Sequence, residues 1–131
     1  MTMFAEHPAE VLLLVFLIIT FFQSGLDKVL DWKGNLSWLT GHFAETPFKS
    51  IVPALFIILT LTELAAGVLS GLGLIQLLRD GGKELAFLGA VLSCVAFLML
   101  LFGQRMAKDY DGARTIAIYF IPAIFLVFLL Q

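Results

Sequence analysis

Cysteine is almost absent from this chain, and charged residues are scarce. Cys94 is the single cysteine, so a disulfide within the chain, a CxxC redox motif and a cysteine-rich metal site are excluded. Lysine, arginine, aspartate and glutamate together form 14% of the 131 residues, and no run of five like charges occurs. Because nucleic-acid binding relies on clustered positive charge, no nucleic-acid partner is expected.

Hydrophobic residues dominate instead. They form 60% of the sequence, and the mean hydropathy is +1.00, whereas soluble domains are about half apolar and about a quarter charged. The length suits a single domain, residues 1–131, with no space for a separate soluble domain. Residues 1–10 contain neither lysine nor arginine, which is atypical of a secretory signal peptide, so we expect the first apolar segment to be retained.

Four apolar segments are long enough to cross a membrane. A helix needs about 20 residues to span the ~30 Å hydrocarbon layer, and such segments occur at roughly residues 11–30, 51–78, 84–103 and 113–130. Backbone groups in lipid must bond within their own segment, and none of these segments alternates as a barrel strand does. We predict an all-α integral membrane protein, an antiparallel four-helix transmembrane bundle with both termini on one side.

The connection between the first two helices carries an amphipathic pattern. Its apolar residues recur at helical spacing: Leu36, Leu39 and Phe43. Trp32 and Trp38 lie nearby, and tryptophan favours the headgroup region of a membrane. We therefore predict a short interfacial helix over residues 35–45, anchored by the two tryptophans. The alternative is an ordinary loop with scattered apolar residues.

The basic residues are unevenly divided between the two sides of this bundle. Arg79 and Lys83 lie on the side of the termini. The other six lie on the opposite side: Lys28, Lys33, Lys49, Arg105, Lys108 and Arg114. The positive-inside rule, taken literally, places the side with six bases in the cytoplasm. Four of those six are also near candidate polar sites, and without them the count is two against two.

Polar side chains follow one face of the first helix. Thr20, Ser24, Asp27 and Lys28 recur there at helical spacing. A polar stripe of this kind is expected to face the interior of a bundle.

Glu63 is the one acidic residue in the middle of the second helix. A central acid costs a few kcal/mol on insertion scales, so it is expected to face the interior and either find a partner or stay protonated. It is a functional candidate, or alternatively a structural link to Lys28. Glu63 lies about 18 Å along its helix from Ile51, so the pair with Lys28 requires the second helix to protrude. Small residues on this helix are predicted packing positions: Gly67, Ser70, Gly71 and Gly73.

The turn between the third and fourth helices is rich in charge. Lys108, Asp109 and Arg114 lie on the same membrane side as Lys28, and they form either part of one interhelical polar network or a solvated turn. For Arg105 and Asp111 the solvated interpretation is favoured.

Ligands for a metal or a heme are not apparent. His7 and His42 are expected on opposite sides of the membrane, so they cannot share an ion. Met99 and Met106 are interpreted as residues that fill packing gaps. No glycine-rich phosphate loop, serine elbow or carboxylate pair is present. We therefore expect no metal, no heme and no independent catalytic activity.

Four segments together resemble the DoxX-like family of small bacterial four-helix membrane proteins: FFQSGLDKVLDW, NLSWLTGHFAETPF, TELAAGVLSGLGL and RMAKDYDGA. The matching positions are Ser24-Gly25 with Lys28 in the first helix and Glu63 with Gly67, Gly71 and Gly73 in the second. The resemblance implies a bacterial inner, or cytoplasmic, membrane and termini in the cytoplasm, opposite to the literal charge count. It also implies an association with thiosulfate:quinone oxidoreductase and with membrane redox complexes.

Three functional hypotheses follow. The first is an accessory subunit of a larger membrane assembly, with a quinone-linked redox complex as the candidate. The second is a quinone- or lipid-binding protein with a polar pocket formed by Asp27, Lys28, Glu63, Lys108, Asp109 and Arg114, which would satisfy the need for convergent polar groups in an apolar site. The third, ranked last, is a proton-coupled transporter that uses Glu63. The expected partners are membrane lipids and other membrane subunits or further copies of the chain.

Overall fold

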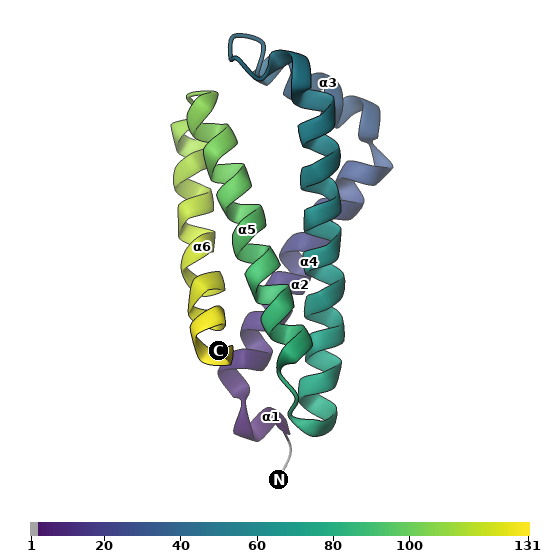
Figure 1. Cartoon of the computed structure of the whole chain (residues 1–131), viewed down its shortest axis with the longest axis vertical. Helices are drawn as coiled ribbons and strands as arrows, with labels where there is room; N and C mark the ends of the chain where they lie inside the picture. The colour runs from purple at the N-terminus through teal and green to yellow at the C-terminus, as the bar shows by residue number, and fades with distance from the viewer. Residues whose placement is uncertain (1–2) are drawn as a thin grey trace.

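Four long helices form the protein (Figure 1). The computed structural model describes residues 3–131, apart from the side chains of Met3 and Lys49, and contains no strand within that range. The long helices are α2 (Pro8–Leu30), α4 (Val52–Asp80), α5 (Glu84–Met106) and α6 (Tyr110–Leu130), and each is long and apolar enough to cross a membrane. Both chain ends lie at the same end of the antiparallel bundle. The predicted all-α four-helix bundle is confirmed.

Three short helices complete the chain. Helix α1 (Met3–Glu6) precedes α2, helix α3 (Trp32–His42) follows it, and the 3-10 helix η1 (Lys49–Ile51) leads into α4. The predicted helix between the first two spans is therefore confirmed, but it begins three residues earlier than residues 35–45 suggested. The residues of the predicted apolar face are half-buried: Leu36, Leu39 and, directly after the helix, Phe43.

The long helices extend beyond their predicted bounds of 11–30, 51–78, 84–103 and 113–130. Helix α5 continues through Gln104 and Arg105 to Met106, and α6 starts at Tyr110 because the Asp109 carboxylate accepts a hydrogen bond from the Gly112 amide at 3.1 Å. Helix α4 ends where Gly81 adopts a φ of 79°, a left-handed conformation that favours glycine. The predicted segments were shorter than the helices because polar residues in the sequence mark the edge of the lipid layer. The helices themselves end at their capping residues, which lie further out.

Small residues bring α4 close to its neighbours. A Cβ on Gly73 would lie 2.4 Å from the Ala86 backbone, and a Cβ on Gly89 would lie 2.7 Å from the Ser70 backbone nitrogen. Gly67 likewise faces the backbone of α2 at Phe22. These contacts match the predicted packing role of Gly67, Ser70 and Gly73. Gly71 departs from that prediction, because nothing lies within 4 Å of its Cβ position.

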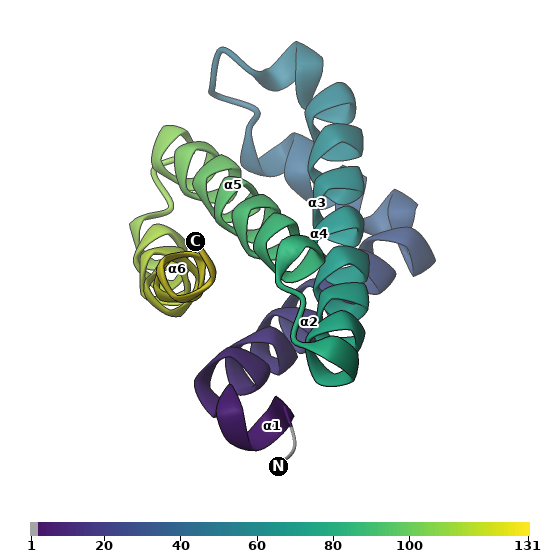
Figure 2. The ribbon, with the colours of Figure 1, turned by 60° about the horizontal axis from the view of Figure 1, so that its bottom comes forward.

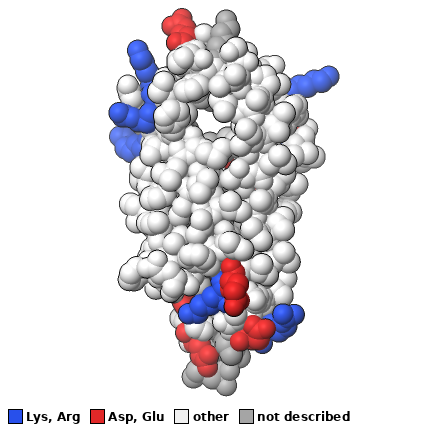
Figure 3. All heavy atoms as spheres, in the orientation of Figure 1, with Lys and Arg blue, Asp and Glu red and all other residues white. Residues whose placement is uncertain are grey.

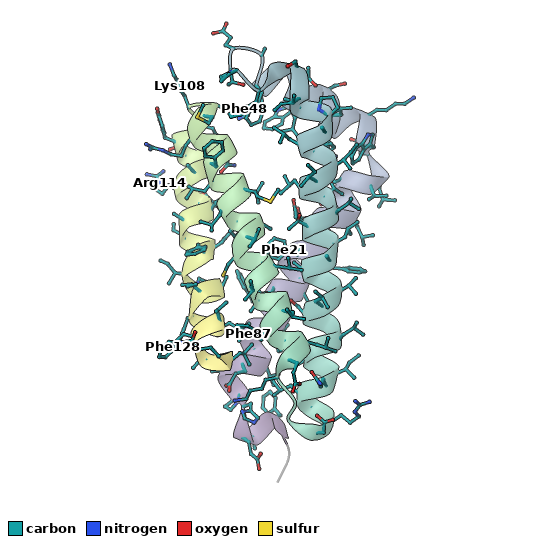
Figure 4. The ribbon with its side chains drawn as sticks, viewed as in Figure 1. Phe21, Phe48, Phe87, Lys108, Arg114 and Phe128 are labelled. Atoms are coloured by element: carbon teal, nitrogen blue, oxygen red, sulfur yellow. The ribbon has the colours of Figure 1, made fainter. Side chains whose placement is uncertain are left out.

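Helices α4 and α5 are closest near the connection 81–83 and separate toward α3 (Figures 1 and 2). In the middle of the bundle Phe21, labelled in Figure 4, meets Phe97 with ring centroids 4.7 Å apart, and Leu14 and Leu17 are fully buried. The separation at the other end leaves room for a cavity beneath α3.

Candidate functional site

A buried ion pair joins the first and second long helices. Glu63 of α4 has no exposed surface, and the Lys28 ammonium of α2 lies 3.1 Å from its Oε1 and 3.4 Å from its Oε2. Ser24 donates a hydrogen bond to Glu63 Oε2 and accepts one from Lys28 at 2.8 Å. The Lys28 ammonium does not approach Glu63 Oε1 at an angle suitable for a hydrogen bond, so its contact with this oxygen is ionic. Glu63 Oε1 therefore has no hydrogen-bond partner in the described part of the chain.

Local sequence explains how this cluster forms. Ser24 and Lys28 are four residues apart and therefore share one face of α2. Gly25 lies between them and is buried against Leu64, where a Cβ would come within 2.4 Å of the leucine side chain. The glycine lets the two helices approach closely enough for the short serine side chain to reach Glu63.

The depth of the pair is set by the offset between the two helices. Trp32, directly after the end of α2, stacks on Phe56 with ring centroids 4.4 Å apart. The end of α2 is therefore level with the second turn of α4, and the first turn of α4 protrudes past it. The sequence predicted that Lys28 and Glu63 could pair only if the second helix protruded, and the offset meets this condition.

A cavity of about 370 Å³ lies between α3, the first half of α4 and the last turns of α5. Most of its wall is apolar, including Leu55, Phe56, Leu59, Met99, Leu100 and Phe102. Lys28 contributes one wall, which connects the cavity to the buried pair. Figure 3 shows a hollow near this end of the molecule, bordered mostly by uncharged atoms, with an acidic side chain visible at its lower edge. The cavity is thus open to the outside of the bundle.

The α3 end of the cavity carries two further polar side chains. His42 of α3 stacks on Trp38, and its Nε2 lies 3.7 Å from the Asp109 carboxylate before α6. Gln104 of α5 lines the same end. Within residues 3–131, His42 Nε2 and Gln104 Oε1 are both buried atoms without a hydrogen-bond partner. The connection after α3 closes this end, since Phe48, labelled in Figure 4, meets Phe102 edge-on at 5.7 Å.

The structure separates the other polar residues that the sequence grouped with Lys28. Asp27 is exposed on the outer face of α2, so the polar stripe of that helix is split between inside and outside. Lys108 and Arg114 point away from the bundle (Figure 4), and Arg114 pairs with exposed Asp111 at 3.1 Å. Asp109 reaches the cavity region only through His42. Ser24, Lys28 and Glu63 are therefore the predicted residues that meet directly.

The remaining predicted residues have ordinary roles at the helix ends. Arg105 lies over the Tyr110 ring, 5.1 Å from its centroid. Trp38 is 63% exposed, as a membrane-surface anchor requires, whereas Trp32 is half-buried against Phe56. Thr20 is half-buried and separate from the ion pair.

His42 and Gln104 are polar cavity residues that the sequence did not assign to a site. His42 lies one helical turn after Trp38, inside the predicted interfacial helix, and Gln104 directly follows the third apolar segment. Nothing in their spacing shows that they meet, because 62 positions of chain separate them. Across the described residues, no group of three or more histidine, cysteine, aspartate or glutamate side chains could hold a metal ion.

Comparisons with protein-family models, with curated proteins and with solved structures find no match to this chain. The DoxX-like resemblance therefore stays a prediction.

Proposed function

We propose that this multi-pass membrane protein binds a lipid-soluble molecule, a quinone or a lipid, in the cavity beneath α3. The observation that carries the proposal is the cavity itself, which combines an apolar wall with the few polar groups of Lys28, His42 and Gln104. Small-molecule sites have this composition, with volumes of about 300–1,000 Å³. Most of the atoms around the hollow in Figure 3 are uncharged, which suits a ligand that arrives from the membrane.

Filling the cavity tests this proposal. Leu59 lines the cavity wall, so Leu59→Trp is expected to occupy the space and to remove most of the quinone or lipid that co-purifies in mild detergent. Leu61→Trp is the matched control, because Leu61 belongs to the same helix but is 62% exposed on its outer face. Native mass spectrometry measures the bound molecules. Equal retention by both variants would place the ligand elsewhere.

We also propose a role as an accessory subunit of a larger membrane assembly, for which a quinone-linked redox complex remains the candidate. Gln23 and Asp27 are exposed on the outer face of α2, and their side chains have no polar partner among the described residues. Exposed Phe22 and Leu26 beside them show that this face is otherwise apolar. Polar side chains at such positions form hydrogen bonds between transmembrane helices, which supports a partner protein here.

The docking role is tested by co-purification at native expression. Gln23→Leu together with Asp27→Leu is expected to release the partner, whereas Ile19→Leu on the same face keeps it. A solitary, monodisperse wild-type protein would contradict the subunit role.

The DoxX-like motifs support a place in the bacterial cytoplasmic membrane with both termini inside. Reporter fusions after Gln131 test this orientation. A green fluorescent protein is expected to be fluorescent there and an alkaline phosphatase inactive, and the opposite pattern would favour the literal charge count.

A further inference from the structure

We infer that the cavity selects a molecule whose headgroup is uncharged and carries hydroxyl or carbonyl oxygens, and that it discriminates against phosphate headgroups. This inference rests on the proposed binding function and names the ligand class. An isoprenoid quinone and a diacylglycerol-type lipid share this chemistry, so the experiment has an arm for each.

The cation that lines the cavity among the described side chains is already paired. Lys28 is the one lysine or arginine among the lining residues that the structure describes, and its ammonium lies 3.1 Å from the fully buried Glu63 carboxylate. At the α3 end, His42 faces the Asp109 carboxylate at 3.7 Å. Among the described side chains that line this space, a phosphate would find no unpaired lysine or arginine, and at the α3 end it would approach the Asp109 carboxylate. Burying an ion without a partner is strongly unfavourable, so the cavity disfavours an anionic headgroup.

The hydrogen-bonding groups of the cavity are, by contrast, incompletely used. Asn35 already donates its amide hydrogens to the backbone oxygens of Asp27 and Asp31. Gln104 Oε1 and His42 Nε2 have no hydrogen-bond partner among residues 3–131, although both atoms are buried. Buried polar atoms are nearly always satisfied, by protein, water or ligand. A ligand hydroxyl that donates a hydrogen bond to Gln104 Oε1, or a ligand oxygen that forms a hydrogen bond with His42 Nε2, would satisfy these atoms.

The arrangement of the wall gives the ligand a direction. His42 and Gln104 lie at the α3 end, whereas Leu59 and Met99 lie one or more turns deeper on α4 and α5. The headgroup therefore lies beneath α3, and the apolar part extends along Leu59 and Met99 toward the middle of the bundle.

Binding of three short-chain probes to the purified full-length protein tests the inference: decylubiquinone, dioctanoylglycerol and dioctanoyl phosphatidate. The two lipids differ only in the phosphate. At least one neutral probe is expected to bind roughly tenfold more tightly than phosphatidate, which corresponds to about 1.4 kcal/mol. Equal or tighter binding of phosphatidate would overturn the inference while leaving a binding function in place. Binding of none of the three would contradict the proposed function itself.

Two variants separate charge from hydrogen bonding. Glu63→Gln leaves Lys28 without its counter-charge, so the ratio of phosphatidate to dioctanoylglycerol binding is expected to rise about tenfold. Gln104→Leu retains the ion pair and is expected to lower the affinity for the neutral probe that binds by about fivefold to tenfold. Thr115→Val, on the exposed face of α6, is the control and is expected to change neither value. Unchanged binding in Gln104→Leu, together with an unchanged ratio in a folded Glu63→Gln protein, would overturn the assignment.

Discussion

The two ends of this bundle are built from the same four helices but pack in opposite ways. At the end with the chain termini, Gly73 and Gly89 bring α4 and α5 into backbone contact, and large apolar side chains are fully buried around them. At the end with α3, Phe43, Phe48 and Phe102 lie where the helices separate, and a cavity remains between them. Small residues therefore permit backbone contact at one end, whereas at the other end Phe48 and Phe102 meet across a wider space that leaves a cavity.

Breaking the Lys28–Glu63 ion pair is expected to have the largest effect on stability, because it leaves a charge buried without a partner. Lys28→Met leaves the buried Glu63 carboxylate without a counter-charge and is expected to lower the free energy of unfolding by about 3–5 kcal/mol. The double variant Lys28→Met/Glu63→Gln should recover most of this loss. Unfolding by SDS in mixed micelles, followed by circular dichroism, measures both. A single variant as stable as the wild type would show that the two charges are not coupled.

Disturbing the packed end comes next. Gly73→Ala places a methyl group 2.4 Å from the Ala86 backbone, so α4 and α5 must move apart at an expected cost of about 1–3 kcal/mol. Gly71→Ala is the matched control on the same helix, since its added methyl group meets nothing within 4 Å. That control is expected to be as stable as the wild type or slightly more so, because alanine favours helix over glycine. Equal losses in both variants would contradict this account of the packing.

Loosening α3 should affect the cavity end alone. Trp32→Leu removes the stacked pair with Phe56, which is worth about 0.5–1.5 kcal/mol. Amide hydrogen exchange within α3 is expected to rise by up to tenfold, with no change around Gly89 in α5. Tyr119→Leu, which removes the contacts with Phe16 and Phe97, controls for the loss of aromatic contacts elsewhere. Faster exchange throughout the bundle would show that the two ends unfold together.

The smallest effect is expected at the exposed pair of Arg114 and Asp111. Both side chains are largely in contact with solvent or headgroups, where ion pairs contribute little. The free energy of unfolding of Arg114→Gln is expected to equal that of the wild type within experimental error, and its affinity for the probes is expected to be unchanged. A clear loss of binding would restore Arg114 to the polar site that the sequence suggested.

The architecture could be predicted because the thickness of a membrane and the rise of a helix leave few choices for apolar segments of this length. The site could be predicted only in part. Glu63 had to face inward, and Lys28 was a nearby base of opposite charge. Asp27 adjoins Lys28 in sequence, yet Lys28 faces inward and Asp27 faces outward. The rotation of α2 about its axis decides this, and residue spacing does not reveal that rotation.

Contacts between distant segments were the part that the sequence could not supply. Asp109 was expected near Lys28 because both are charged and lie on one membrane side, yet it faces His42. The difference depends on where α3 lies above the cavity, and a short amphipathic pattern predicts a helix without predicting what it touches.

The order of contacts along the chain has a consequence for biosynthesis. The main packing surfaces join helices that follow one another: α2 with α4, α4 with α5, and α5 with α6. A ribosome that delivers the helices in this order lets each new one dock on its predecessor, so the Lys28–Glu63 pair can form before α5 is made. The cavity gains its second wall only with α5, and the His42–Asp109 contact must await the turn before α6. The proposed binding site is thus completed only after α5 and the turn before α6 have been made, and the packing of α6 on α5 follows it.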